Sequence, residues 1–334
     1  MINLSIKHVD LPIVAEQWYE DLWSFLTKYR EGNKVLRHND MKFNKVYKKH
    51  YCIFNERCAI YALSQKQIIL AKGYLYKFIK ALKKNIATPD NIEYWVNKQE
   101  DIKRSHPKII KVWKTTLIPL YENFSHEVAY KYLTQLNIRT CPYCNRQYTF
   151  TISKGGDGTF HTRPEYDHFF DKSSYPLLAL SFYNLVPSCH DCNHGKSTIS
   201  SSINPFFDGF SAKFVIAGKD GRRLNKNEIA RLNGPDEFSV EFDNPSDDEK
   251  KNIATFGLRQ QYNEHKDYVQ EMIDKSMAYN SVIQQGIVDS FQGTFQSAKD
   301  VYHFVWGPCL FLEEQENRPL SKLTADILEQ LGII

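Results

Sequence analysis

Apolar residues recur at three- and four-residue spacing along most of the N-terminal part, with few Gly or Pro residues to interrupt them. The pattern is clearest over residues 15–29 and 64–85. Such spacing places apolar side chains on one face of an α-helix, so we expect a helical region over residues 12–135. We expect its last helix to begin with Ser125 as N-cap and to end at Asn137.

The pattern changes after this helical region. Residues 148–152 alternate apolar and polar side chains, residues 155–158 read Gly-Gly-Asp-Gly, and residues 160–162 can resume a strand. Alternation interrupted by turn residues predicts a short antiparallel hairpin. Residues 205–244 mix short apolar runs with glycines and charges, and they predict no firm element.

Helical periodicity returns in the C-terminal part. Ser246 and Glu249 have the spacing of a capping box, which predicts the start of a helix. An apolar face continues beyond it, formed by Tyr262, Val269, Met272 and Ile273. No repeat or low-complexity segment stands out.

Composition indicates a folded protein, since 42% of the residues are hydrophobic and 25% are charged. The first twenty residues include acidic side chains and lack the organisation of a signal peptide. No stretch has the roughly 20 apolar residues that span a bilayer. We therefore expect a cytoplasmic protein with no membrane partner.

The net charge of +4 hides an asymmetry. Residues 1–140 carry 24 Lys and Arg against 13 Asp and Glu, a net +11, whereas residues 141–334 carry 19 against 26, a net −7. The basic part can grip phosphates of a nucleic acid. Lysines solvated on helix surfaces are an equally good explanation of the same charge.

Four of the seven cysteines form two Cys-x-x-Cys pairs, Cys141 with Cys144 and Cys189 with Cys192, separated by 44 residues. Each pair can supply two thiolates to one tetrahedral zinc. Four thiolates leave no open position on the metal, so the predicted zinc is structural. A redox dithiol or buried free thiols are the alternatives.

The remaining cysteines are Cys52, Cys58 and Cys309, and we expect them to be small buried side chains.

The segment between and across these pairs carries a longer motif. Asp167-His168 is followed by Asn184-Leu-x-Pro-x-Cys-x-x-Cys-Asn193-x-x-Lys196. Order and spacing resemble the HNH (ββα-metal) endonuclease family in its zinc-bound form, over residues 141–208. Asn rather than His follows the last cysteine, so the sequence resembles the H-N-N variant.

The resemblance implies a role for each matching residue. His168 is then the general base that takes a proton from the attacking water. Asp167 and Asn193 bind one Mg²⁺ or Mn²⁺ through hard oxygen ligands. Asn184 fixes the loop that orients the His168 ring. In addition, Asp167 and His168 are adjacent on an extended segment, so their side chains point to opposite sides.

Neighbouring residues carry weaker signals. His190 and His194 are candidate metal ligands or phosphate donors, although a surface role fits their positions better. His161 can lie near the site only if the hairpin folds back. Lys196 is expected either to contact a phosphate or to be solvated. Asn204-Pro205-Phe206 resembles a stretch that follows the motif in some HNH subfamilies, and we expect it to pack the helix.

Tryptophans occur throughout the helical region, at Trp18, Trp23, Trp95 and Trp113. Aromatic side chains can stack on the bases of single strands. Their helical spacing favours a place in the core instead.

The leading hypothesis for function is hydrolysis of phosphodiester bonds in DNA, most naturally double-stranded. The arrangement also resembles bacterial HNH proteins that accompany an ATPase in anti-phage defence, as in Septu-type and some retron-associated systems. The alternative is a zinc-bound nucleic-acid-binding module without catalysis, and a third hypothesis is a redox protein that uses the Cys-x-x-Cys pairs.

The expected fold class is α+β and predominantly α-helical, with a small ββα-metal core between helical regions. The expected domains are a helical N-terminal region over residues 1–137 that binds DNA or a partner, a zinc-bound nuclease core over 138–210, and a mixed then helical C-terminal region over 211–334.

Overall fold

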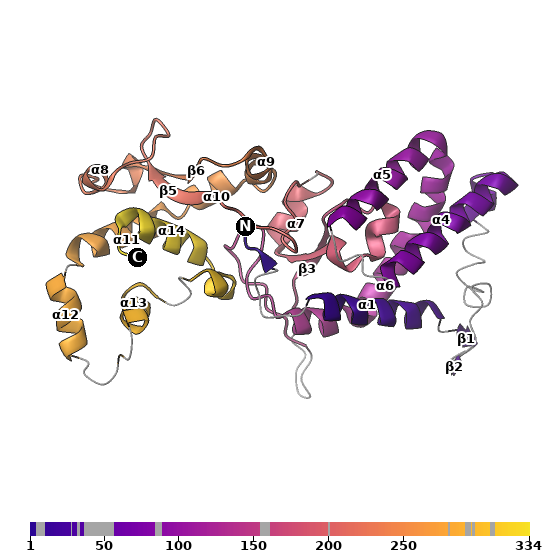
Figure 1. Cartoon of the computed structure of the whole chain (residues 1–334), viewed down its shortest axis with the longest axis horizontal. Helices are drawn as coiled ribbons and strands as arrows, with labels where there is room; N and C mark the ends of the chain where they lie inside the picture. Colours follow the sequence, from indigo (N-terminus) through magenta and orange to yellow (C-terminus); the bar gives the residue numbers. More distant parts are fainter. Residues whose placement is uncertain are drawn as a thin grey trace.

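A computed structural model describes residues 1–4, 11–27, 29–31, 34–36, 57–83, 89–153, 161–199, 201–279, 281–290, 295, 298–307 and 311–334. The fold is predominantly α-helical α+β, as expected, and its β structure within these ranges consists of two-stranded antiparallel pairs. The molecule is elongated, with the N-terminal helices at one end, the C-terminal helices at the other, and β3 and α7 between them (Figure 1).

Four long helices and one small strand pair are described in the N-terminal part: α1 (Leu11–Thr27), β1 (Tyr29–Glu31), β2 (Lys34–Leu36), α4 (Gln65–Lys83), α5 (Pro89–Ser105) and α6 (Pro107–Leu136).

Trp18 of α1 organises this part of the core. Its ring packs edge-on against Phe124 and Tyr132 of α6, with centroid distances of 4.9 and 5.0 Å. Its indole Nε1 donates to the Leu180 carbonyl at 3.1 Å. A buried indole N–H needs such a partner, and this contact ties α1 to the segment that lies beside the candidate site.

Two other tryptophans of this part are also buried. Trp95 and Trp113 are buried, as their helical spacing predicted, while the side chain of Trp23 lies outside the described residues.

Helix α6 ends where predicted but begins much earlier. Asn137 adopts a left-handed C-cap conformation, and its N–H donates to the Leu133 carbonyl. The predicted N-cap at Ser125 is wrong, because the helix runs continuously from Pro107. Ser125 is buried within the helix and its side chain hydrogen-bonds Tyr121. The polar side chain is therefore satisfied inside the helix instead of capping a new one.

The predicted hairpin is described in part. Ile152 and Thr162 form an antiparallel bridge, and Thr140 pairs with Tyr148 in the same way. The predicted turn at residues 155–158 and Phe160 lie outside the described residues.

The central part contains a ββα unit. Strand β3 (Glu165–His168) pairs antiparallel with β4 (Leu185–Ser188), and α7 (His190–Lys196) follows with Cys189 as N-cap. Asp167 pairs with Val186, and His168 pairs with Leu185. Two 3-10 helices, η2 (Pro176–Leu180) and η3 (Phe182–Asn184), connect the strands.

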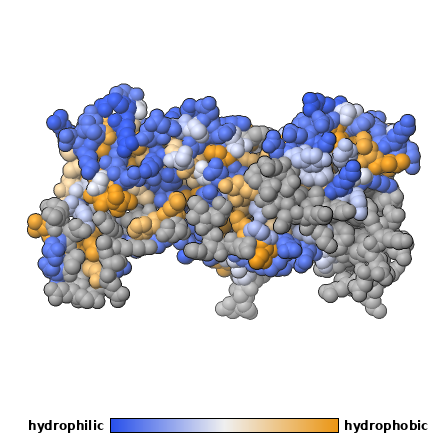
Figure 2. Space-filling model, viewed as in Figure 1, coloured by the Kyte–Doolittle hydropathy of each residue, from blue (hydrophilic) through white to orange (hydrophobic). Residues whose placement is uncertain are grey.

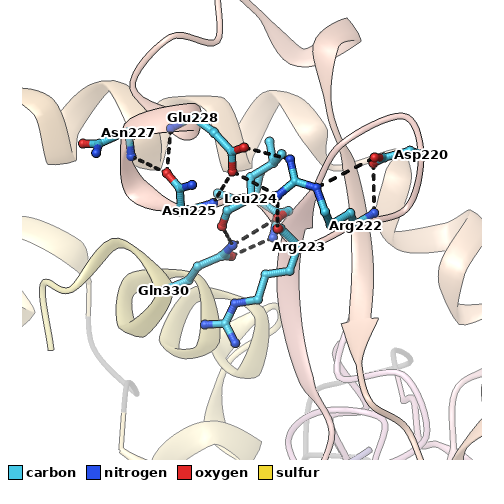
Figure 3. A network of polar contacts seen from close by, with 9 residues as sticks. Asp220, Arg222, Arg223, Leu224, Asn225, Asn227, Glu228 and Gln330 are labelled. Atoms are coloured by element: carbon cyan, nitrogen blue, oxygen red, sulfur yellow. Dashed lines mark hydrogen bonds and ion pairs between the residues drawn. The ribbon is translucent and has the colours of Figure 1, made fainter.

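The stretch left unassigned in the sequence contains an antiparallel ribbon, formed by β5 (Lys213–Ala217) and β6 (Ser239–Asp243). Helix α8 (Lys226–Ile229) and the 3-10 helix η4 (Pro235–Glu237) connect the two strands. Figure 3 shows Asn225 capping α8, while Arg222 binds both Glu228 and Asp220.

The remaining elements are α9 (Asp247–Thr255), α10 (Leu258–Asn263), α11 (Lys266–Ala278), α12 (Ser281–Ser290), α13 (Ala298–Trp306), η5 (Leu312–Asn317) and α14 (Ser321–Leu331).

Helix α14 covers the free edge of β5. The Gln330 side chain accepts from the Ile216 N–H at 2.7 Å and donates to the carbonyls of Ile216 and Leu224 (Figure 3). Asp326 accepts from the Phe214 N–H at 2.9 Å. These side chains satisfy backbone groups that a neighbouring strand would otherwise pair.

The capping box at Ser246 and Glu249 is confirmed, and it begins α9. The predicted apolar face is also confirmed, but it is divided between two helices: Tyr262 lies in α10, and Val269, Met272 and Ile273 lie in α11, all buried. Among the described residues on the face shown in Figure 2, hydrophilic side chains predominate and hydrophobic patches are scattered between them. Among the described helices, none is both long and apolar enough to cross a membrane.

Replacing Ser246 with Ala should lower the free energy of unfolding by about 1 kcal/mol, because the Glu249 N–H at the start of α9 loses its side-chain acceptor. Urea denaturation measures the change. Lys251→Ala, on an exposed position of the same helix, is the matched control and should change stability by less than about 0.5 kcal/mol. Equal effects of the two substitutions would contradict the capping role.

Candidate functional site

The four cysteines of the two pairs form one buried cluster. The Sγ atoms of Cys141, Cys144, Cys189 and Cys192 all lie within 4.8 Å of one another, and none forms a disulfide. The Sγ atoms of Cys144 and Cys189 are 3.9 Å apart. A tetrahedral zinc with Zn–S bonds of about 2.3 Å separates its sulfurs by about 3.8 Å. The cluster therefore fits a metal such as zinc.

Contacts around the first pair connect it to the rest of the chain. The Ile2 N–H donates to the Pro142 carbonyl at 2.8 Å, and the Leu320 N–H donates to the Asn145 carbonyl at 2.7 Å. The Tyr262 hydroxyl donates to the Cys144 carbonyl. Segments from both ends of the sequence thus meet at this cysteine pair.

Asp167 faces the cysteine cluster and α7. Its Oδ2 accepts from the Tyr143 hydroxyl at 2.6 Å, and its Oδ1 accepts from the Lys196 ammonium at 3.0 Å. Burial raises the pKa of Asp167, although Lys196 and Tyr143 both favour the charged form. The carboxyl group is only 3% exposed, so these two partners replace the water that it has lost.

Lys196 is neither solvated nor exposed to a phosphate, and both placements expected for it are wrong. Its side chain is fully buried, and its ammonium also donates to the His168 carbonyl at 2.8 Å. The physical reason is charge compensation, because the buried Asp167 needs a cation and Lys196 on the facing helix supplies one.

His168 points to the opposite side of β3, as strand alternation predicts. Its ring packs edge-on against Tyr121 of α6, with centroids 4.5 Å apart, and its Nε2 lies 3.3 Å from the Ala179 carbonyl. Burial lowers the pKa of His168 to about 3, with the nearby Lys172 acting in the same direction.

The tautomer of His168 follows from this contact. A carbonyl oxygen only accepts hydrogen bonds, so Nε2 must carry the proton. In the neutral ring, Nδ1 then holds the lone pair.

Asn184 holds together the loop that follows His168. Its Oδ1 accepts from the Phe170 N–H at 2.8 Å, and its Nδ2 donates to the carbonyls of Phe170 and Leu178, each at 3.1 Å. The side chain is fully buried. Since Leu178 and Ala179 are adjacent, Asn184 also positions the carbonyl that faces His168.

Asn193 contacts Glu165, and no hydrogen bond between Asn193 and Asp167 is seen in the described residues. The Asn193 Nδ2 donates to Glu165 Oε2 at 2.6 Å. His190 Nδ1 lies 2.9 Å from Glu165 Oε1, and His194 Nε2 lies 3.7 Å from Oε2. Burial disfavours the charge on Glu165, but the bonds from Asn193 and His190 outweigh it and lower its pKa.

Glu165 was missed in the sequence analysis. It lies two residues before Asp167 on a strand, which places both carboxylates on the same face. His190 and His194 are four residues apart, so they share one face of α7. These two spacings were the features of the sequence that could have indicated a cluster of Glu165, His190 and His194.

The other residues singled out by the sequence have the following surroundings. The His161 ring lies 6.0 Å from the ring of Tyr130. Cys58 is buried, as expected, while Cys52 and Cys309 lie outside the described residues. Asn204 is buried and donates to the Tyr183 carbonyl at 3.0 Å, and Phe206 packs against Phe182 and Tyr183.

Comparison with known proteins gives one partial likeness. The chain is 35% identical over 78 residues to the Septu protein PtuB of Bacillus thuringiensis. The match covers 21% of this chain and 30% of the length of PtuB. No protein-family model matches the chain, and no solved structure matches it either.

Replacing Cys189 with Ser should remove the bound metal, because a tetrahedral site with four protein ligands loses one of them. We expect the variant to lose about one zinc atom per chain and to have a lower melting temperature. Metal analysis and thermal unfolding measure both effects. The control is Cys58→Ala, which removes a buried thiol outside the cluster, and this variant should retain the zinc of the cysteine cluster. Full zinc retention by the Cys189 variant would contradict the assignment.

Replacing Lys196 with Met should destabilise the protein by about 3–5 kcal/mol, because it leaves the buried Asp167 without its cation. Urea denaturation measures the change. The double variant Asp167→Asn, Lys196→Met removes both charges and should recover most of the loss. Lys172→Met, at a more exposed lysine on the other side of His168, is the matched control. A small effect of Lys196→Met, close to that of the control, would show that the ion pair contributes little.

Proposed function

We propose that this chain is a metal-dependent endonuclease of the HNH type, which hydrolyses phosphodiester bonds of DNA as an effector of anti-phage defence. One observation carries the proposal. His168 is a buried imidazole whose Nε2 lies 3.3 Å from a backbone carbonyl, and it lies beside Asp167 on the first strand of a ββα unit.

This geometry suits His168 to act as a general base. Burial keeps the ring neutral at cellular pH, which is the form that accepts a proton. A base with a pKa of about 3 is weak, so catalysis requires the negative charge of the bound phosphate to raise the pKa of His168 in the complex. Nδ1 is the nitrogen left to take that proton from water. The Ala179 carbonyl then stabilises the imidazolium, because it accepts more strongly from the charged ring. Asn184 keeps this carbonyl in place through its bond to Leu178.

Asp167 and Asn193 are the proposed ligands of a Mg²⁺ or Mn²⁺ ion, which when bound supplies positive charge beside the scissile phosphate. Asn193 uses its amide nitrogen for Glu165, so its carboxamide oxygen is the atom suited to a hard cation. Lys196 already balances the charge of Asp167. We therefore expect the cation to bind weakly in the absence of DNA.

Basic residues of the N-terminal part support a nucleic acid as the substrate. Residues 1–140 have a net charge of +11, and Lys108, Lys111 and Lys114 are exposed at three-residue spacing on α6. This is the same helix that contributes Tyr121 to the surroundings of His168. Phosphates bound along this helix would bring the backbone of DNA toward the ββα unit.

The likeness to the Septu protein PtuB supports a role in anti-phage defence. An unrestrained nuclease would damage the genome of its own cell, so a controlling partner is part of the proposal. We propose an ATPase for this partner, by analogy with the systems that the sequence resembles.

A plasmid-nicking assay with Mg²⁺ or Mn²⁺ tests the catalytic role of His168. Replacing His168 with Ala should slow cleavage by about 10²–10⁴-fold, the usual contribution of a general base. Asn193→Ala, at a half-buried position, should also reduce cleavage and should require more Mn²⁺ for half-maximal rate.

His126→Ala, at an exposed histidine on α6, is the matched control and should cleave normally. Zinc content and circular dichroism establish that the His168 variant is folded. Equal cleavage by the parent and the folded His168 variant would end the catalytic proposal. DNA binding without any cleavage by the parent would favour a catalytically inactive nucleic-acid-binding module.

A further inference from the structure

Strand β3 and helix α7 carry a second group of side chains whose chemistry suits a metal. Glu165 of β3 and His190 and His194 of α7 bring their ligand atoms within 4.8 Å of one another. Their side chains are 39%, 66% and 64% exposed, so a cation from solution can reach them. This group includes neither a cysteine of the sulfur cluster nor Asp167.

We propose that Glu165, His190 and His194 form a binding site for a divalent transition-metal ion, such as Zn²⁺, Co²⁺ or Ni²⁺.

The distances fit such an ion. Ligands about 2.0–2.1 Å from a tetrahedral metal lie about 3.3 Å from one another. Glu165 Oε1 lies 2.9 Å from His190 Nδ1, and Glu165 Oε2 lies 3.7 Å from His194 Nε2, so the observed separations bracket this value.

Helix α7 aligns the two histidines. They lie four residues apart on one face of the helix, and their ring centroids are 3.9 Å apart. Two imidazoles and one carboxylate are the ligand set of several zinc sites with an open fourth position. Such a position is available to water or to a phosphate oxygen.

The chemistry of the ligands separates this site from the one proposed at Asp167 and Asn193. Imidazole nitrogen selects borderline transition metals, whereas Mg²⁺ prefers oxygen ligands. The two sites adjoin through Glu165, whose other oxygen accepts from Asn193. For this reason Glu165 variants affect both sites, and the histidine variants provide the cleaner test.

Metal uptake by the tag-free protein, with zinc already in its cysteine cluster, tests the proposal. Equilibrium dialysis against Co²⁺ in the presence of millimolar Mg²⁺ is followed by metal analysis and by the visible absorption of Co²⁺. We expect one equivalent of Co²⁺ beyond the zinc. His194→Ala should weaken its binding by more than the roughly 10- to 100-fold typical of changes outside the ligand set. The double variant His190→Ala, His194→Ala should take up none.

His126→Ala is the matched control and should bind Co²⁺ like the parent, since this exposed histidine lies on α6. Both histidines of the proposed site are also exposed, so their replacement leaves the core unchanged, and retained zinc shows that the variants are folded. Absence of the additional equivalent in the parent, or its full retention in the double variant, would overturn the proposal. Because no DNA is present, this outcome is independent of whether the chain cleaves DNA.

Discussion

Two pairs of cysteines, 44 residues apart in sequence, must meet in one cluster of sulfur atoms before the candidate site exists. Strands β3 and β4 have only four residues each, and strands this short do not hold a register by themselves. Cys189 follows β4 directly and is also the N-cap of α7. A metal held by the cluster would therefore fix the end of one strand and the beginning of the helix together, and with them the positions of Asp167 and Asn193.

Burial of charge imposes a second constraint. Asp167 and Lys196 have both lost most of their hydration, and each is stable there only because the other is present. His168, on the opposite face of the same strand, avoids this cost by remaining neutral. The alternation of side chains along β3 thus places a buried ion pair and a buried neutral imidazole on opposite faces, one residue apart. The proposed function gives these two faces different roles.

Features that depend on neighbours in sequence were predictable. Three features follow from residues a few positions apart: the capping box at Ser246, the end of α6 at Asn137, and the spacing of two cysteines within each Cys-x-x-Cys pair. Ser125 shows the limit of such reasoning, because its preference for an N-cap is local, whereas the buried contacts of α6 extend across it and continue the helix. Tertiary packing outweighed the local preference there.

The side-chain contacts within the site could not be predicted from the sequence, because they depend on how α7 packs against β3. Lys196 and Asp167 are 29 residues apart, and nothing in the local sequence of either shows that they will meet. The same holds for Glu165, which contacts both histidines and Asn193 only after the helix has docked.

Lys196 also connects the two faces of β3, and this connection bears on how a cation and the base could act together. Its ammonium bonds the side chain of Asp167 and the backbone carbonyl of His168. A cation that moves the ammonium away from Asp167 would also change its hydrogen bond to that carbonyl, because one side-chain group donates to both. That carbonyl is part of His168, whose ring contacts the Ala179 carbonyl. In the proposed enzyme, a cation bound at Asp167 would therefore act, through the Lys196 ammonium, on the backbone of His168.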